Sequence, residues 1–428
     1  MVKKLTEGVE AVGHIEGLDG EPSAGYLKLD GRGAVVSLPK VGPAGEIATA
    51  FFDGEGAVPH HLRFRSTDGS VVLGECEDVG GSVSFSGTSL TRIRAFRVIK
   101  TGGVADYAEV DGMKSEIDGL AKWSGMSTVS HKVRAEPFAI VLQAESQETV
   151  ELGGGANAAI VCAFSYNPSP KGNVFGITDV ARLRTSSAEL WPWQQHAAVH
   201  HMFQDLMCLV YGRPCLSQVA SVKREDDQPD LPDDGRRVWR EVYEPTFGRS
   251  VEGAEPLDRA KDEPLFYLRD VDRAALTKWI EEWDLWSRPT WIAVTTMFQR
   301  GTTVEANLLQ VGVALEALGY AMWKETQPAA SAKRPQGKTN TPSYASLLKR
   351  VVDATRVVHP DIYGSQTATK WRESFYEAFK GTKHADNPLP DGVEARRFAD
   401  QGMNLIRVWL GVRLGVDRKV LAERLGKR

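Results

Sequence analysis

The stretch VEANLLQVGVALEAL, residues Val304–Leu318, decides the class of the second half of the chain. Its larger apolar side chains recur every three or four positions, at Val304, Leu308, Val311, Leu315 and Leu318. Because residues with this spacing lie on one face of an α-helix, the stretch predicts a long helix with one side turned towards a core.

Helical patterns continue on both sides of this stretch. Before it, Ala274–Trp286 is predicted to form a helix that Pro289 ends, and Gly301 is predicted to interrupt the helical pattern of Trp291–Trp323. After it, helices are predicted at Ser343–Val358, Thr367–Ala385, Val393–Leu414 and Arg418–Leu425. The sequence from residue 263 to residue 428 therefore predicts an all-helical bundle.

The first 262 residues have a different pattern. Short runs rich in Val, Ile, Phe and Thr alternate with clusters of Gly, Asp and Pro, which is typical of strands joined by turns. These runs include Tyr26–Leu38, Leu62–Cys76, Ser82–Ser86, Leu90–Lys100, Phe138–Ala144 and Ala158–Tyr166. Asp68-Gly69 predicts a hairpin, and Trp191–Val210 predicts one long helix. We therefore expect an α+β protein with a β-rich domain at 1–262 and a helical domain at 263–428.

The composition excludes several classes of protein. Of the 428 residues, 42% are hydrophobic and 25% are charged, which is ordinary for a globular chain and unlike a disordered or fibrous one. No apolar run approaches the roughly 20 residues that cross a bilayer, and Met1–Glu7 lacks the apolar stretch of a signal peptide. The four cysteines are scattered without a C-x2-C pair. We therefore expect a cytoplasmic protein without membrane association, disulfide framework, metal or cofactor.

Charge is unevenly distributed along the chain. The net charge is -4, but Lys and Arg outnumber Asp and Glu in residues 265–428, whereas the acidic residues are in excess before them. A basic C-terminal half favours an anionic partner such as nucleic acid. Solvated lysines without any partner would produce the same excess, so both interpretations stay open.

One segment combines a histidine with cations at the predicted end of the helix Thr367–Ala385. Lys380 and His384 share a helical face, and Lys383 directly precedes His384. An imidazole can remove or donate a proton near neutral pH, and lysines can hold a phosphate group and its developing charge. Since the RNA 2′-hydroxyl is itself a nucleophile, this set could cleave RNA without a metal. A solvated helix end without function has the same composition.

Glu316 is a further candidate because it lies in the most apolar part of the helix predicted at Val304–Leu318. Burying a carboxylate is costly unless the carboxylate is paired. In the functional interpretation, Glu316 lies across the bundle from His384 and orients it. In the alternative, Glu316 reaches solvent along the side of its helix.

Three histidines of the helix predicted at Trp191–Val210 open another possibility. His196 and His200 are four positions apart and share a helical face, with His201 beside them. Such a pair could hold zinc in a hydrolase, but the acid of an H-E-x-x-H motif is missing and no third ligand is evident. A packed histidine cluster is therefore the expected interpretation.

Two phrases of the sequence resemble a known family. Val304–Leu318, followed by a helical hairpin and by FKGTKHADNP at Phe379–Pro388, resembles the Apea-like branch of HEPN domains. The β-rich half, in which ITDVARL at Ile177–Leu183 leads into the helix Trp191–Val210, is similar to the N-terminal domain that accompanies that branch. The resemblance covers most of the chain.

The resemblance implies a compact helical bundle that dimerises and brings two histidine-bearing helices together. Many such domains are metal-independent endoribonucleases of toxin or anti-phage abortive-infection systems. His384 takes the position of the family's histidine, whereas Glu377, Ala378 and Phe379 stand where the family has an arginine. Arg372 lies too far back, and the nearby lysines lack the forked guanidinium.

Two functions follow as expectations. In the first, the chain is an anti-phage endoribonuclease that acts as a homodimer on RNA and responds to a phage-derived trigger through its N-terminal half. Its catalytic set would be His384 as general acid and base, Lys380 and Lys383 on the phosphate, and Glu316 as the orienting residue. In the second, the bundle has lost its chemistry and serves as an RNA-binding or dimerisation module.

Overall fold

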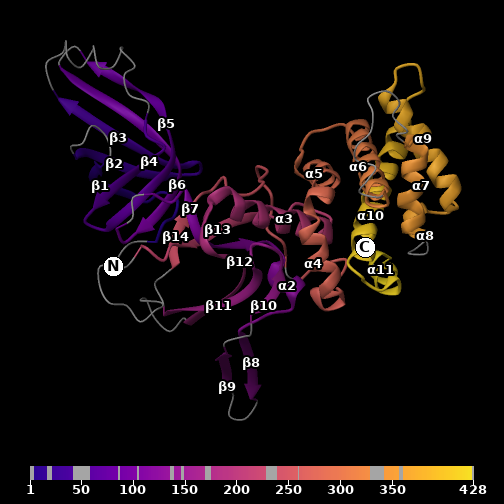
Figure 1. The fold of residues 1–428 in the computed structure, drawn as a ribbon, viewed down its shortest axis with the longest axis horizontal. Coiled ribbons are helices and arrows are strands. Elements are labelled where there is room, and N and C mark those ends of the chain that lie inside the picture. Colours follow the sequence, from indigo (N-terminus) through magenta and orange to yellow (C-terminus); the bar gives the residue numbers. More distant parts are fainter. Residues whose placement is uncertain are drawn as a thin grey trace. The chain divides into compact units, whose positions relative to one another are not determined.

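The computed structural model describes residues 4–16, 22–41, 58–84, 87–103, 106–134, 139–145, 149–168, 175–227, 239–258, 260–327, 342–355 and 360–426. In these residues, a β-rich region with two helices precedes a run of helices along the chain, so the fold class is α+β as predicted (Figure 1). Contacts divide the chain into two compact units that interleave in sequence. The first unit contains residues 1–116, 183–200 and 217–249, and the second contains residues 117–182, 201–216 and 250–428. The boundary predicted after residue 262 stays a prediction.

Within the described part of the first unit, six antiparallel strands close into a barrel. β6 pairs with β3 on one side and with β5 on the other, so the order β3-β2-β1-β4-β5-β6 returns to β3 and leaves no open edge. The strands are β1 (Glu10–Glu16), β2 (Ser23–Asp30), β3 (Gly33–Val41), β4 (His61–Ser66), β5 (Gly69–Ser84) and β6 (Thr88–Thr101).

Turns and alternating side chains explain this barrel. The predicted run Tyr26–Leu38 is a hairpin in which Asp30 pairs with Gly33, and the hairpin predicted at Asp68-Gly69 is confirmed. Gly33 has a φ of 129°, and a Cβ on it would lie 2.2 Å from the Ala95 carbonyl oxygen, so this corner requires glycine. Alternate positions fill the interior with Ile15, Leu27, Leu29, Ala34, Val36, Leu38, Leu62, Phe64, Leu73, Cys76, Ile93, Ala95 and Val98.

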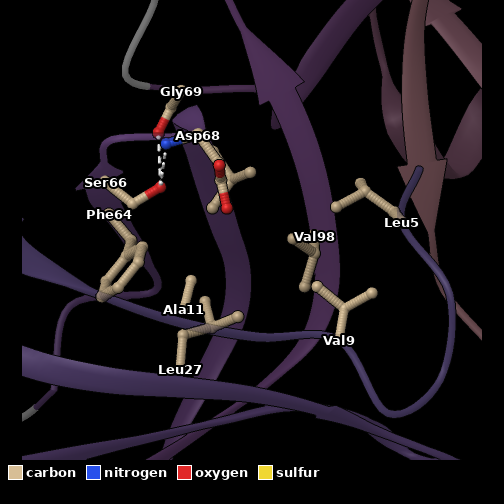
Figure 2. A pocket seen from close by; sticks show the side chains of 10 residues that line it. Leu5, Val9, Ala11, Leu27, Phe64, Ser66, Asp68, Gly69 and Val98 are labelled. Carbon is tan, nitrogen blue, oxygen red and sulfur yellow. Dashed lines mark hydrogen bonds between the residues drawn. The ribbon is translucent and has the colours of Figure 1, made fainter. Parts of the chain in front are cut away.

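One part of the barrel holds a small apolar cavity of about 40 Å³ (Figure 2). Its walls are Leu5, Val9, Ala11, Leu27, Phe64, Ser66, Asp68, Gly69, Val71 and Val98. The Ser66 hydroxyl donates to the Gly69 carbonyl at 3.2 Å and accepts from the Asp68 N–H at 3.2 Å, which fixes the β4–β5 turn at the edge of the cavity (Figure 2). A space of this size holds about one or two water molecules.

The first unit continues beyond the barrel with further strands. These are β7 (Glu109–Ile117), the second part of β12 (Phe175–Pro192), β13 (Ser217–Lys223) and β14 (Trp239–Tyr243). They follow the order β12-β7-β13-β14, and β14 pairs with β6. The predicted long helix is α3 (Trp193–Tyr211), whose residues up to His200 belong to the first unit and whose residues from His201 onward belong to the second. It begins two residues later than predicted, because Trp191 and Pro192 still pair with β7.

The second unit begins with short elements. They are α2 (Leu120–Ser124), the two-stranded sheet of β8 (Val129–Arg134) and β9 (Ala139–Ala144), and the hairpin of β10 (Val150–Gly153) and β11 (Ala158–Pro168). The glycines of this hairpin turn pack against α4 (Arg273–Glu281). A Cβ on Gly153 would lie 2.8 Å from Thr277, and a Cβ on Gly154 would lie 2.8 Å from Ile280. These two glycines therefore allow the turn to pack closely against α4.

The C-terminal helices of the second unit begin at polar caps. Side chains of Asp272, Thr303, Ser343, Thr367, Asp391 and Asp417 accept hydrogen bonds from first-turn N–H groups. The remaining elements are η1 (Leu268–Asp270), α5 (Trp283–Phe298), α6 (Val304–Glu325), α7 (Tyr344–Ala354), α8 (Pro360–Tyr363), α9 (Ala368–Lys383), α10 (Gly392–Arg413) and α11 (Arg418–Leu425). The predicted break at Gly301 is confirmed, since it lies between α5 and α6.

The prediction that Pro289 ends a helix is wrong. α4 ends at Glu281, and α5 continues through Pro289. A proline inside a helix costs about 3 kcal/mol, so tertiary packing must offset this cost. Trp286 of α5 is fully buried with its ring centroid 5.1 Å from that of Trp409 in α10, and Arg413 donates to the Glu282 carboxylate at 2.6 Å.

α6 supplies much of the core of the helical part. The predicted apolar stripe is buried, and Leu308, Val311, Leu315 and Leu318 are each at most 2% exposed. α10 packs against this stripe at Gly402, where a Cβ would lie 2.5 Å from Val311 Cγ1 and 3.2 Å from Phe375 Cε2. Among the helices that the structure describes, none has both the length and the apolar character needed to cross a bilayer.

Candidate functional site

The predicted site lies at the C-terminal end of α9. The helix ends at Lys383, and His384 caps it by donating its backbone N–H to the Lys380 carbonyl at 2.9 Å. The prediction that His384 shares a helical face with Lys380 is wrong, because the backbone of His384 is extended, with a φ of -125° and a ψ of 123°. The side chains of Lys383 and His384 are exposed, and Lys380 is half-buried. The imidazole and the adjacent ammonium group are therefore open to a ligand that approaches from solvent.

The chain after His384 folds back over the end of α9. The Asn387 N–H donates to the His384 carbonyl at 3.1 Å. Gly381 faces this returning segment, and a Cβ on Gly381 would lie 2.2 Å from the Pro388 carbonyl oxygen. The glycine of the FKGTKH phrase is thus required by close packing, and it holds the backbone around His384 in place.

An aromatic stack joins α6, α7 and α9 beside this helix end. The ring of Tyr344 stacks on Phe379 with 4.6 Å between centroids and lies 5.5 Å from the ring of Tyr376. The Tyr344 hydroxyl donates to the Gly312 carbonyl at 3.2 Å. The stack therefore links the helix that carries Glu316 to the helix that ends at His384.

Both lysines of the predicted site lie over rings of this stack. Lys380 Nζ is 5.3 Å from the centroid of Tyr376, and Lys383 Nζ is 5.5 Å from the centroid of Phe379. Each such contact is worth about 0.5–1 kcal/mol at an exposed site. Lys380 also forms an ion pair with Glu377 at 3.3 Å. The two ammonium groups are thus held along one face of α9.

Glu316 is a half-buried residue of α6 whose charge acts on Tyr344. Burial raises the pKa of Tyr344 well above its ordinary value, and the charges of Glu316 and Tyr376 raise it further. The structure therefore places the half-buried Glu316 carboxylate near Tyr344. In the described part of the chain, His384 makes its hydrogen bonds through its backbone. The predicted pairing of Glu316 with His384 stays a prediction.

The stack adds Tyr344 and Tyr376 to the predicted set. Tyr376 could have been found, because it shares a helical face with Lys380 and Lys383 through the spacing of four and seven residues. Tyr344 could not, because it lies on α7, and nothing local in the sequence shows which helix packs there.

The arginine position of the family motif is also clear in the structure. Glu377 pairs with Lys380, whereas Ala378 and Phe379 are buried. Arg372 is half-buried and lies twelve residues before His384, which is about 18 Å along a helix. No arginine of α9 therefore lies next to His384.

A separate histidine cluster is sealed inside the first unit. His196 and His200 are both 0% exposed. The Thr185 hydroxyl lies 2.9 Å from His196 Nδ1 and 3.0 Å from His200 Nε2. His196 Nε2 is 3.1 Å from the Val110 carbonyl, and His200 Nδ1 is 2.5 Å from Ser115 Oγ. Every ring nitrogen of the pair thus has a protein partner.

Only one arrangement of protons satisfies all four contacts when both rings are neutral. The Val110 carbonyl can only accept, so His196 donates from Nε2 and accepts at Nδ1 from the Thr185 hydroxyl. Thr185 then accepts from His200 Nε2, and His200 accepts from Ser115. Across the described residues, no three His, Cys, Asp or Glu side chains are grouped to hold a metal. The structure supports the packed-cluster interpretation over the zinc site.

Comparison with known proteins assigns the chain to a family. Residues 19–283 match the family described as ApeA N-terminal domain 1. This segment runs from β2 to the end of α4 and includes both α3 and the histidine cluster. No curated protein and no solved structure matches the chain. Because the matched segment covers more than half of its residues, the chain belongs to the ApeA N-terminal domain 1 family and is an ApeA-like protein.

Proposed function

We propose that this ApeA-like chain is an anti-phage defence protein of the abortive-infection type. In this proposal, residues 263–428 form a HEPN-like endoribonuclease, and the N-terminal domain responds to a phage-derived trigger. The observation that carries the proposal is the exposed His384 ring beside Lys383, in a chain of the ApeA family. Lys380 and the aromatic stack support it by holding a second cation on the same helix face.

The chemistry needs a base, an acid and positive charge. His384 takes the proton of the RNA 2′-hydroxyl, and the 2′-oxygen attacks the adjacent phosphorus. The bond to the 5′-oxygen breaks, and that oxygen receives a proton, which leaves a 2′,3′-cyclic phosphate and a 5′-hydroxyl. Lys380 and Lys383 neutralise the charge that develops on the non-bridging oxygens. No metal takes part in this sequence of steps.

A homodimer completes the proposed site. One imidazole can act as base, but the leaving oxygen needs an acid at the same time. A second copy of the chain supplies that acid through its own His384. Glu316 keeps its proposed role as the orienting residue, since its negative charge favours the protonated Tyr344 hydroxyl that donates to Gly312.

RNA cleavage by the purified chain tests this proposal. Mixed RNAs are incubated in the presence of EDTA with the parent, with His384→Ala and with His14→Ala. His14 is a matched control, because its half-exposed side chain lies on the barrel. The parent and His14→Ala should release fragments with cyclic phosphate ends, and His384→Ala should not. Cleavage by His384→Ala at the parent rate would refute the assignment.

The second candidate function is an RNA-binding or dimerisation module without catalysis. The observation in its favour is that Glu377, Ala378 and Phe379 occupy the family's arginine position and that Glu377 already pairs with Lys380. Under this function, RNA should bind without new fragments, in the absence and in the presence of phage components. The affinity should fall steeply with salt, because the contacts are to phosphate.

A further inference from the structure

A buried arginine of α10 caps the C-terminal end of α3. Arg407 is 4% exposed, and its Nε donates to the Leu209 carbonyl at 2.7 Å. Its Nη2 donates to the Val210 carbonyl at 3.2 Å, and its Nη1 donates to Asn404 Oδ1 at 2.8 Å. Leu209 and Val210 belong to the last turn of α3, whose carbonyls have no partner within the helix. The Val210 carbonyl also accepts the Leu265 N–H at 2.9 Å, so the guanidinium adds a second donor there. It supplies a donor to the Leu209 carbonyl and a positive charge where the helix dipole is negative.

Gly212 completes the fit. It ends α3 with a φ of 70° and donates its N–H to the Cys208 carbonyl at 2.7 Å. A Cβ on Gly212 would lie 2.6 Å from Arg407 Cζ and 2.8 Å from Nη1. The glycine thus allows both the left-handed turn and the close approach of the guanidinium.

α10 connects this cap to the candidate site. Five residues before Arg407, Gly402 packs on Val311 and Phe375, which belong to α6 and α9. Val311 precedes Gly312, which receives the Tyr344 hydroxyl, and Phe375 lies on the helix that ends at His384. A continuous set of close contacts therefore runs from the end of α3 through α10 to the aromatic stack.

The contact also crosses the limit of the matched family segment. Leu209 and Val210 lie inside residues 19–283, whereas Arg407 lies far beyond them. We propose that Arg407 is a coupling residue, through which the C-terminal end of α3 fixes α10 and thereby the helices of the candidate site. Only the consequence for RNA cleavage rests on the proposed function, since the coupling itself is a property of the fold.

Hydrogen exchange of the full chain tests the coupling without RNA. A double-mutant cycle compares Gly212→Ala, Arg407→Gln and the combination. Gly212→Ala should displace the guanidinium and speed exchange about tenfold both at the end of α3 and in α9 and α10. When Arg407 is already replaced by Gln, Gly212→Ala should still speed exchange at the end of α3, because the left-handed φ disfavours alanine there. It should not speed exchange in α9 and α10 any further.

Two further variants keep the test decisive. Asn404→Ala removes the side chain that accepts a hydrogen bond from the Arg407 guanidinium. It should speed exchange in the same segments by a smaller factor, and it replaces Arg407→Gln in the test if that variant does not fold. Arg413→Gln is the matched control, because Arg413 of α10 binds Glu282 and Glu325 at 2.6 and 2.7 Å but makes no cap on α3. It should leave exchange at the end of α3 unchanged. Additive effects of Gly212→Ala and Arg407→Gln in α9 and α10 would overturn the coupling, whatever the RNA assays show.

Discussion

The ring of Phe379 lies against Gly312 so closely that a Cβ on Gly312 would stand 2.2 Å from Phe379 Cδ2. Phe379 is 2% exposed and opens the FKGTKH phrase, whereas Gly312 lies in the middle of VEANLLQVGVALEAL. Tyr344 stacks on the same ring and donates to the carbonyl of the same glycine. The two phrases of the family resemblance therefore meet in one contact at the candidate site.

Gly312→Ala should destabilise the protein by about 2 kcal/mol, because the added methyl group forces Phe379 out of its position. The midpoint of urea unfolding measures this loss. Gly392→Ala is the matched control, since its Cβ would meet Val304 at an ordinary 3.7 Å. An equal effect of both substitutions would show that the Phe379 contact is not tight.

Gly381→Ala should open the segment that folds back over α9, because its Cβ would lie 2.2 Å from the Pro388 oxygen. We expect the Asn387 amide, which bonds to the His384 carbonyl, to exchange at least about tenfold faster. Hydrogen exchange with site resolution measures this rate. An unchanged Asn387 rate would mean that the segment does not depend on the glycine.

The buried histidine pair should make the stability fall in weak acid. Burial lowers the pKa of His196 below its ordinary 6.5. Below that pH the unfolded chain takes up a proton at this site while the folded chain does not, so the free energy of unfolding decreases as the pH falls. The slope contributed by one proton is at most about 1.4 kcal/mol per pH unit. Urea midpoints between pH 7.5 and 5 measure it, and His196→Gln should have the shallower slope. Parallel curves for the parent and the variant would contradict this origin.

Thr185→Val should cost about 2 kcal/mol, although it preserves the shape of the side chain. The hydroxyl joins His196 Nδ1 to His200 Nε2, and its loss removes this partner from both nitrogens. Thermal unfolding at pH 7.5 measures the change. A variant within about 0.5 kcal/mol of the parent would show that water or a neighbour replaces the hydroxyl.

His384→Ala should leave the stability within about 0.5 kcal/mol of the parent, because the side chain is exposed and only its backbone caps α9. The melting temperature checks this. A large loss would mean that a missing activity of this variant reports unfolding rather than chemistry.

Local patterns gave a reliable account of where most helices of the C-terminal half lie. The predicted stripe is buried from Leu308 to Leu318, whereas Val304 is half-buried, and α11 begins and ends at the predicted residues Arg418 and Leu425. Pro289 shows the limit of such patterns. The free-energy cost of a proline inside a helix is set by neighbouring residues. The packing of Trp286 on Trp409, which offsets this cost, joins residues far apart in the chain.

The candidate site shows the same limit. The sequence could place Lys380, Lys383 and His384 near one helix end, but the helical period fixes the spacing of the two lysines only, because His384 lies beyond the helix with an extended backbone. It could not show that Tyr344 stacks beside them or that the Glu316 carboxylate lies near Tyr344. It also could not show that His196 and His200 complete each other's hydrogen bonds through Thr185.

By itself, the sequence determined that a β-rich region precedes a helical one, which face of α6 is buried and that a helix ends close to His384, because residues a few positions apart set these through propensity and periodicity. The tertiary structure alone decided that β6 closes a barrel, that Phe379 rests on Gly312 and that Arg407 caps α3. The physical reason is that these contacts join residues dozens or hundreds of positions apart. Their free energy comes from close packing and from paired buried polar groups, which exist only once the chain is folded.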